Sequence, residues 1–341
     1  MRIPFVGLVC LLCAAACAQQ GNIALDVVVN DKSGKPVAGL QEKDFQILDD
    51  KRPQPILSFQ AMSGGSEPVN ILIVVDAVNV GFERIGYERD QIRRFLLQND
   101  GKLPRPVSIA VLSDSGLRMG PEGSSDGRAL AAYLDGNQTG LRTITRSQGF
   151  YGAQERLDLS IAALRQFAAE EADKPGRKLV IWLSPGWPML SGPSVQLTDK
   201  AERSVFEQIV SISTWLRQAR IALYGVDPLG TSDAGTYQTY AWQDFLKGVR
   251  RPRQVMPGDL ALQVISVQTG GRVLNSGNDI AEEIERCVHD ADAWYALSFA
   301  AIPADSPDEY HQIEVKIVGQ LKLKAQTRAG YYAQPVRRMG Q

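Results

Sequence analysis

The stretch Asn70-Ile71-Leu72-Ile73-Val74-Val75-Asp76 decides the fold of this chain, because an uninterrupted apolar run ends in a carboxylate. Such a run predicts a strand buried on both faces of a parallel sheet. Asp76 then lies at the carboxyl end of that strand, which is the edge where open α/β sheets bind their ligands. The sequence therefore predicts an α/β fold with a binding edge at Asp76.

The middle of the chain alternates between strand-like and helix-like segments, which predicts a doubly wound, mostly parallel sheet. Further strands are expected at 107–112, 178–183 and 221–226, with an antiparallel edge hairpin near 116–120. The expected helices cover 83–98, 126–135, 155–170, 198–217, 260–268 and 279–290.

Both ends of the chain carry short segments that alternate between apolar and polar residues, as antiparallel strands do. Those after residue 291 include 312–318 and 321–325, which we expect to form a tight hairpin at Gly319-Gln320. Because three short strands rarely fold alone, we expect residues 22–61 and 292–335 to build one small antiparallel β-sandwich. The α/β domain, residues 68–290, is then inserted between its two halves.

The first 18 residues are typical of a signal peptide. Met1-Arg2 supplies a positive start, and the apolar stretch from Phe5 to Ala16 is too short for a membrane span. Ala16-Cys17-Ala18 predicts cleavage before Gln19 and export to the periplasm or the extracellular space. The alternative is a lipoprotein anchored through Cys17.

Composition excludes several classes of function. The 341 residues are 44% hydrophobic and carry a net charge of −1, which gives no reason to expect a nucleic-acid partner. Cys287 is the one cysteine outside the signal region, and it shares a helical face with Ile284 and Val288, so we expect it in the core. The chain lacks the glycine-rich phosphate-binding motifs, so no nucleotide cofactor is expected.

Several motifs, in order, resemble the VWFA-related Acidobacterial domain family, a group of exported proteins with a von Willebrand factor type A-like domain. They span nearly the whole mature chain and include Gly34-Lys35-Pro36-Val37-Ala38-Gly39-Leu40, Lys178-Leu179-Val180-Ile181-Trp182-Leu183-Ser184, Tyr224-Gly225-Val226-Asp227, Tyr310-His311-Gln312-Ile313 and Ala329-Gly330-Tyr331-Tyr332. The resemblance implies a type A domain joined to a β-rich region, and it assigns no activity to the chain.

The resemblance also implies a metal-ion-dependent adhesion site built from three loops, and this chain departs from the pattern in each. The first loop should read Asp-x-Ser-x-Ser, but valines stand at Val78 and Val80. The second, 152–156, offers no hydroxyl, and in the third Pro185 replaces the expected aspartate. A hard cation needs several oxygen ligands, so we expect the site to be degenerate, with Asp76 a weak candidate ligand. Asp76 instead suits an Asx cap on its loop.

The candidate binding edge consists of residues that follow the expected strands, namely Asp76, Asn79, Ser184, Trp187 and Asp227. Trp182 lies within a strand and is expected in the core, whereas Trp187 lies in a loop, where an aromatic can anchor a partner. Two interpretations remain open. The first is a non-enzymatic module that binds a protein or a cell-envelope ligand; the alternative is an exported hydrolase using acidic residues at this edge. The sequence does not indicate an oligomeric state.

Overall fold

A computed structural model describes residues 21–63, 67–136, 150–188, 197–228, 242–275 and 279–335. The chain forms a mixed α/β structure with one mostly parallel sheet and two antiparallel sheets of four strands each. The expected signal peptide, residues 1–18, lies outside the described residues. Within them, no helix is both long and apolar enough to cross a bilayer.

The parallel sheet has the strand order β11-β10-β9-β5-β6-β7, with the apolar run that ends at Asp76 near its centre. All neighbours are parallel except β7 and β8, which both pair antiparallel with β6. Its strands are β5 (Val69–Asp76), β6 (Lys102–Ser113), β7 (Gly116–Met119), β8 (Ser124–Asp126), β9 (Arg177–Leu183), β10 (Ile221–Val226) and β11 (Val273–Leu274). The expected edge hairpin is present as β6 and β7.

Helices cover both faces of this sheet, which explains why β5 is apolar at successive positions. Ile73 and Val75 point to one hydrophobic cluster, and Leu72 and Val74 point to the other. On the first face lie α1 (Phe82–Leu96), α2 (Gly127–Gly136) and α7 (Ile280–His289). On the second lie α3 (Phe150–Glu171), α4 (Asp199–Gln218) and α6 (Leu262–Gln268). Cys287 is buried in the first cluster, as expected.

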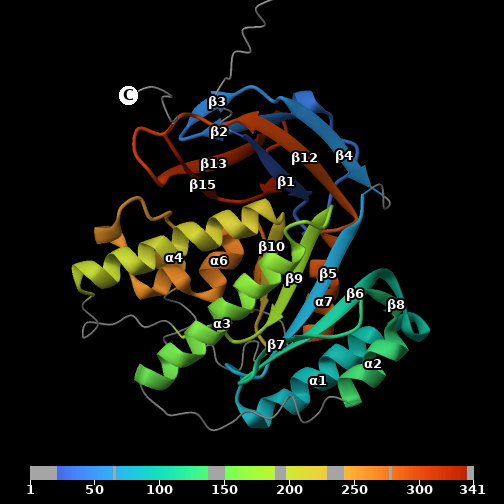
Figure 1. The fold of residues 1–341 in the computed structure, drawn as a ribbon. Helices are drawn as coiled ribbons and strands as arrows, with labels where there is room; N and C mark the ends of the chain where they lie inside the picture. The colour runs from blue at the N-terminus through green and yellow to red at the C-terminus, as the bar shows by residue number, and fades with distance from the viewer. Residues whose placement is uncertain are drawn as a thin grey trace, which may run out of the picture.

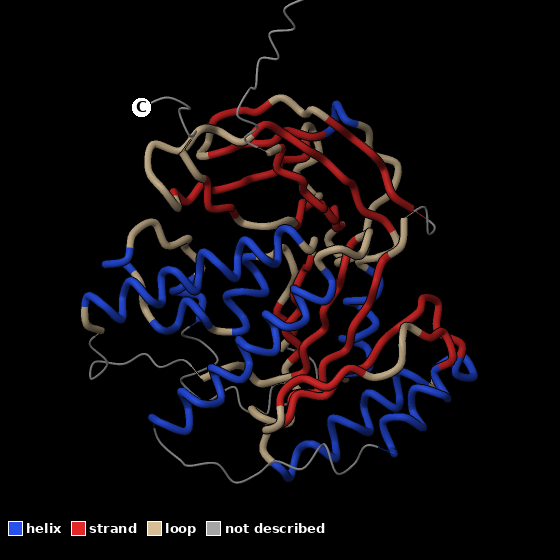
Figure 2. Tube along the Cα trace, viewed as in Figure 1, coloured by secondary structure: helices blue, strands red, loops and turns tan. Residues whose placement is uncertain are grey.

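The antiparallel strands come from both ends of the chain and form two sheets around a shared apolar core, here called the sandwich (Figure 2). One sheet has the order β14-β1-β12-β4 and the other the order β15-β13-β2-β3. The strands are β1 (Asn22–Asn30), β2 (Phe45–Asp49), β3 (Arg52–Gln54), β4 (Ser58–Ser63), β12 (Ala293–Ala300), β13 (Glu309–Ile317), β14 (Lys324–Gln326) and β15 (Gly330–Ala333). Short 3-10 helices occupy Glu42–Asp44, Gln98–Gly101, Trp242–Phe245, Pro252–Gln254 and Pro257–Leu260.

The prediction of a tight hairpin at Gly319-Gln320 is wrong. β13 pairs with β2 and β15, whereas β14 pairs with β1 in the opposite sheet. The backbone N–H of Val318 donates to the carbonyl of Asp44, and the turn at Gly319, with φ of 73°, carries the chain from one sheet to the other. Leu321 is fully exposed at this turn, whereas Leu323 and Ala325 pack partly against the sandwich core.

The two ends of the parallel sheet have different surroundings. The amino ends of β5, β9 and β10 face the sandwich, and the carboxyl ends lie at the far side of the molecule (Figure 1). Arg220, which precedes β10, pairs with Asp26 of β1 and with Glu67, each at 2.7 Å. We call the boundary between the sheet's amino ends and the sandwich the seam.

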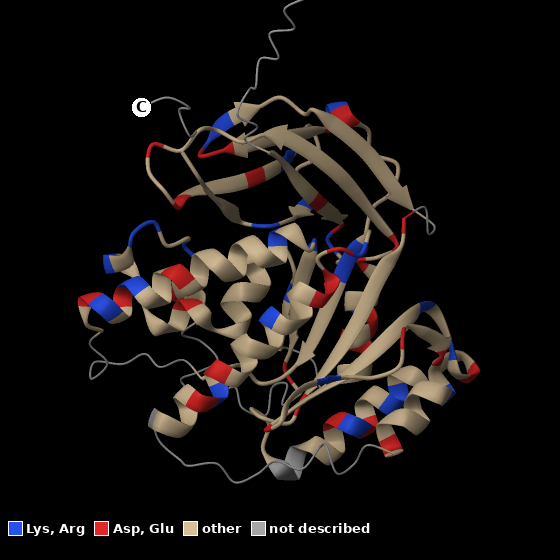
Figure 3. Ribbon diagram, viewed as in Figure 1, with Lys and Arg blue, Asp and Glu red and all other residues tan. Residues whose placement is uncertain are grey.

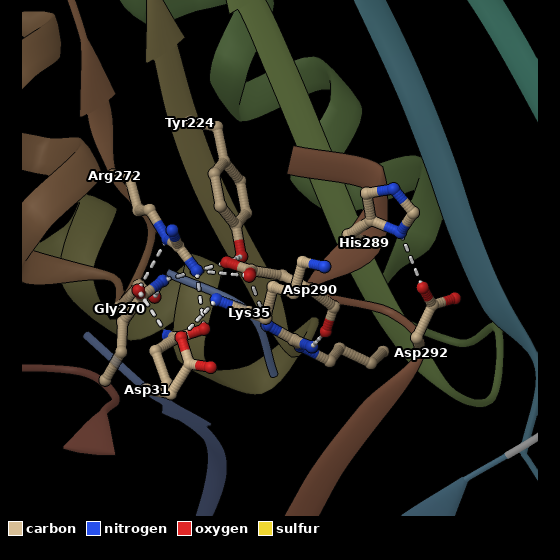
Figure 4. A network of polar contacts seen from close by, with 11 residues as sticks. Asp31, Lys35, Tyr224, Gly270, Arg272, His289, Asp290 and Asp292 are labelled. Atoms are coloured by element: carbon tan, nitrogen blue, oxygen red, sulfur yellow. Dashed lines mark hydrogen bonds and ion pairs between the residues drawn. The ribbon is translucent and has the colours of Figure 1, made fainter. Parts of the chain in front are cut away.

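A buried network centred on Asp290 closes the seam (Figure 4). Its carboxylate accepts hydrogen bonds from Arg272, from the Tyr224 hydroxyl at 3.0 Å and from Gln326 Nε2 at 3.3 Å. Arg177 donates to the Asp290 carbonyl at 2.7 Å. Because Gln326 belongs to β14 and Tyr224 to β10, this one acid links the sandwich to the parallel sheet.

Candidate functional site

Asp76 ends β5 with its side chain fully buried and fully hydrogen-bonded. Oδ1 accepts the backbone N–H groups of Val78 and Asn79, both at 3.0 Å. Oδ2 accepts Asn79 Nδ2 at 2.8 Å and the indole Nε1–H of Trp182 at 2.9 Å. The backbone contacts form the expected Asx cap. The bond from Trp182 was not predicted, because β9 brings it from 106 residues away.

Asn79 connects this carboxylate to the neighbouring helix. Its Nδ2 also donates to the hydroxyl of Ser160 on α3 at 2.9 Å, and that hydroxyl donates to the Arg156 carbonyl at 2.8 Å. The Oδ1 atom of Asn79 is buried without a hydrogen-bond partner. The sequence prediction placed Asn79 at the edge but gave no reason to include Ser160.

Glu88 is a second buried carboxyl group on this side of the sheet. It lies on α1 between Ile85 and Ile92, on the face that packs into the core, and its side chain has no exposure to solvent. Neither of its oxygens has a hydrogen-bond partner. The available sequence signal was a glutamate at a core-facing position of the amphipathic helix expected at 83–98.

Burial sets the protonation preference of both acids. It raises the pKa of Asp76 above its usual value, although the Trp182 and Asn79 hydrogen bonds act in the opposite direction. The pKa of Glu88 is raised well above its usual value, first by burial and then by the nearby charge of Asp76. Two neighbouring carboxyl groups in a low-dielectric site therefore favour one ionised and one protonated partner.

The residues around Asp76 do not fit a bound divalent cation. All four of its hydrogen bonds come from N–H donors, which occupy the positions that a cation would need. Val78 and Val80 are buried in the apolar clusters on opposite faces of the sheet. In the described parts of the chain, no cluster of three or more His, Cys, Asp or Glu side chains is arranged to hold a metal.

The remaining predicted edge residues lie on the next two strands. Ser184 follows β9, where its backbone N–H donates to the Val226 carbonyl at 2.9 Å and its Oγ accepts Gly186 N–H at 3.2 Å. Asp227 follows β10 and is buried, and β9 separates it from Asp76. Ser184 and Asp227 therefore lie at the same edge as Asp76, at the ends of the next two strands.

The interpretation of Trp187 as an exposed anchor is wrong. Its side chain is only 3% exposed, and its ring packs edge-on against Trp182 with 5.1 Å between centroids. The loop after β9 folds back because this apolar surface is buried against the core of the second face. Trp182 is buried as expected, so the two tryptophans form one support beneath Asp76.

An exposed aromatic side chain does occur nearby, on α3. This helix runs antiparallel to β5, since Ser160 lies beside Asn79 while Glu171 accepts a hydrogen bond from Asn70 at the strand's start. Tyr151, near the helix N-terminus, is 85% exposed. A rise of 1.5 Å per residue places Tyr151 roughly 13 Å beyond Ser160, past the carboxyl edge.

No protein-family model and no curated protein matches the sequence. Among solved structures, the chain is similar to the manganese-loaded TRAP protein of Plasmodium vivax, with 10% identity, a TM-score of 0.37 and coverage of 81% of this chain and 98% of that one. It is also similar to the N-terminal domain of TFIIH p34, with 14% identity, a TM-score of 0.26 and coverage of 58% and 96%. Both scores are too low to support a conclusion about this chain's function.

Proposed function

We propose that this chain is a non-enzymatic protein-binding module with a von Willebrand factor type A-like α/β domain, which contacts its partner at the carboxyl edge of the parallel sheet. The observation that carries the proposal is the closed coordination of Asp76 by four N–H donors. An acid bound in this way is available neither to a cation nor to a substrate. What remains at the edge is a rigid surface suited to recognition by shape.

The alternative, a hydrolase, draws support from one observation. Asp76 and Glu88 are neighbouring acids with raised pKa values, a pattern that marks many catalytic sites. Both side chains, however, have no exposure to solvent, so a substrate has no access to them. The structure thus favours the binding interpretation over the catalytic one.

Tyr151 is our candidate contact residue in place of Trp187. A large aromatic side chain that projects past the edge can enter a pocket on a partner. The partner is proposed to be a protein or another component of the cell envelope, because the N-terminal sequence predicts export.

The test uses residues 19–341 as bait for the cell-envelope fraction of the source organism, followed by direct measurement of the captured partner's affinity. We expect Tyr151→Ala to weaken binding at least tenfold, about 1.4 kcal/mol, as truncation of a central aromatic contact does. Leu321→Ala is the control, since Leu321 is also highly exposed but lies between β13 and β14 of the sandwich. Equal affinity of both variants would contradict the proposed contact surface.

A parallel screen of hydrolase substrates addresses the alternative. Steady turnover by the unmodified protein that is lost in Asp76→Asn would reject the binding proposal in favour of catalysis. Turnover unaffected by this change would show that the activity does not depend on Asp76 and comes from another site or from a contaminating enzyme.

A further inference from the structure

A small cavity lies in the seam, at the opposite end of the sheet from Asp76. Its volume is about 20 Å³, enough for one compact ion but too little for a nucleotide or a peptide. Its walls come from β1, from the amino ends of β9 and β10, from the end of α4 and from the segment before β15. The charged and hydroxyl side chains that line it include Asp26, Arg177, Arg217, Arg220, Thr327 and Arg328.

The positive charges in this cavity exceed the negative ones. Asp26 is the one acid among the lining residues, and both of its oxygens bind Arg220, which also binds Glu67. Figure 3 shows basic segments along the seam between the sandwich and the parallel sheet. Three arginines therefore remain without a carboxylate in the cavity.

Arg328 is the most unusual of these three. Its side chain is only 7% exposed, and it makes no hydrogen bond or ion pair within the described structure. Arg217, half-buried on α4, is equally without a partner there. Burial and the charge of Arg217 lower the pKa of Arg328 to about 10, so it is still a cation at neutral pH. The charge of Asp26 acts on the pKa of Arg328 in the opposite direction, but both Asp26 oxygens already accept hydrogen bonds from Arg220. A buried cation that no carboxylate binds directly is costly, which points to an additional anionic partner.

Two further donors in the same place lack partners. The hydroxyl of Thr327 is buried without a hydrogen bond, although Thr327 lines the cavity. Arg177 uses its two terminal nitrogens on the Asp290 carbonyl and the Tyr224 hydroxyl, but its Nε–H is buried without an acceptor. An ion with several oxygens would accept from all of these groups at once, whereas a single-atom anion has no separate acceptor for each.

We propose that the seam cavity binds one inorganic oxyanion of the size of phosphate or sulfate, held by Arg217, Arg328, the Thr327 hydroxyl and the Nε–H of Arg177. Guanidinium groups match the oxygens of such ions in paired hydrogen bonds. The four groups come from α4, β9 and the C-terminal segment, so the bound ion would cross-link the sandwich and the parallel sheet.

Thermal unfolding of residues 19–341 tests this proposal directly. The protein is first dialysed into an anion-poor buffer, and sodium phosphate or sodium sulfate is then titrated against sodium chloride at constant ionic strength. We expect a saturable rise in Tm with phosphate and sulfate but not with chloride, because a ligand that binds only the native state stabilises it. The same response to chloride, or no saturation, would overturn the proposal.

Glycerol phosphate tests the size argument. A phosphate ester should bind at least tenfold more weakly than phosphate, because the cavity has no room for the glycerol group. Equal binding would show that the site serves a larger ligand and would overturn the assignment to an inorganic ion.

Variants separate the site from general salt effects. Arg328→Met should abolish the saturable response while leaving the Tm in anion-poor buffer unchanged or higher, because it removes an uncompensated buried charge. Arg203→Met, an exposed position on the same helix as Arg217, should respond as the unmodified protein does. If Arg328→Met does not fold, Thr327→Val and Arg217→Met replace it. Each of these variants should bind phosphate or sulfate at least tenfold more weakly than the unmodified protein does. An unchanged anion response in these variants would refute the site.

Discussion

The two ends of the parallel sheet, roughly 25 Å apart along the eight residues of β5, handle buried charge in opposite ways. At the carboxyl end, the carboxylate of Asp76 is surrounded by neutral N–H donors and its neighbour Glu88 favours the protonated form. At the amino end, arginines outnumber the acids that line the same cavity. At one end a buried carboxylate is surrounded by neutral donors, and at the other the cations outnumber the acids.

This difference changes where a ligand is expected in the molecule. Open α/β sheets bind ligands at the carboxyl ends of their strands. Here donors surround Asp76, but Glu88, one oxygen of Asn79 and the indole Nε1–H of Trp187 are buried without hydrogen-bond partners. The amino end, in contrast, holds charged donors that lack acceptors, among them the Nε–H of Arg177. The following experiments test that contrast, beginning with the largest expected effect.

Asp290→Ala should destabilise the protein most, by about 3–5 kcal/mol, because it removes a buried acceptor and leaves Arg272 and Tyr224 without it. Chemical denaturation measures this change. Asp292→Ala is the control two residues away, where half-exposed contacts with Arg105 and His289 contribute little. Equal losses in the two variants would contradict a special role for the buried network.

Asp76→Ala should cost about 2–4 kcal/mol, since four N–H donors lose their acceptor. The loss is smaller than for Asp290 because no cation is left unpaired. Denaturation curves for Asp76→Ala and for the exposed control Asp173→Ala provide the comparison. A stability unchanged from the unmodified protein would mean that the cap is dispensable.

Glu88→Gln should remove a pH dependence of stability. Because the native pKa is raised, the native state keeps a proton that the unfolded state releases above about pH 4.5, so stability falls as pH rises from there. The slope is at most about 1.4 kcal/mol per pH unit. Denaturation between pH 4 and pH 8 should show the variant gaining stability relative to the unmodified protein, whereas the exposed control Glu207→Gln should not.

Trp182→Phe should lower stability by about 1–2 kcal/mol, because it removes one hydrogen bond to Asp76 and part of the packing on Trp187. The other three donors to Asp76 stay in place. A loss of stability as large as that of Asp76→Ala would show that the indole hydrogen bond accounts for the whole stabilising effect of the cap.

Added magnesium should leave the stability of the protein unchanged. We expect no saturable rise in Tm with added Mg²⁺ or Mn²⁺ below roughly millimolar concentration, because Asp76 offers no open oxygen. A micromolar isotherm by calorimetry that disappears in Asp76→Ala would contradict a degenerate site.

The sequence predicted the parallel sheet well, because long apolar strands and amphipathic helices carry strong periodic signals. It predicted the Asx cap at Asp76 for a similar reason, since a cap depends on residues close in the chain. It failed at Gly319-Gln320, where the pairing of β13 and β14 depends on partners far away in the sequence.

The candidate site was harder to predict than the fold. Exposure decides whether Trp187 can meet a partner, and exposure depends on how a loop returns to the core. The arginines of the seam cavity are spread along the chain from Arg177 to Arg328, and no local sequence pattern joins all of them. Glu88 was the exception, because its place between Ile85 and Ile92 on one helical face was visible in the sequence.

The insertion of the α/β part between the two halves of the sandwich also determines how a pulling force passes through the molecule. The first described strand, β1, and the last, β15, both belong to the sandwich, while β5 to α7 lie between β4 and β12. Tension applied to the two chain ends therefore loads the pairings of β1 with β12 and of β15 with β13 first. The carboxyl edge of the parallel sheet lies away from these strands, so the sandwich would take up a pulling force before it reaches the proposed binding edge.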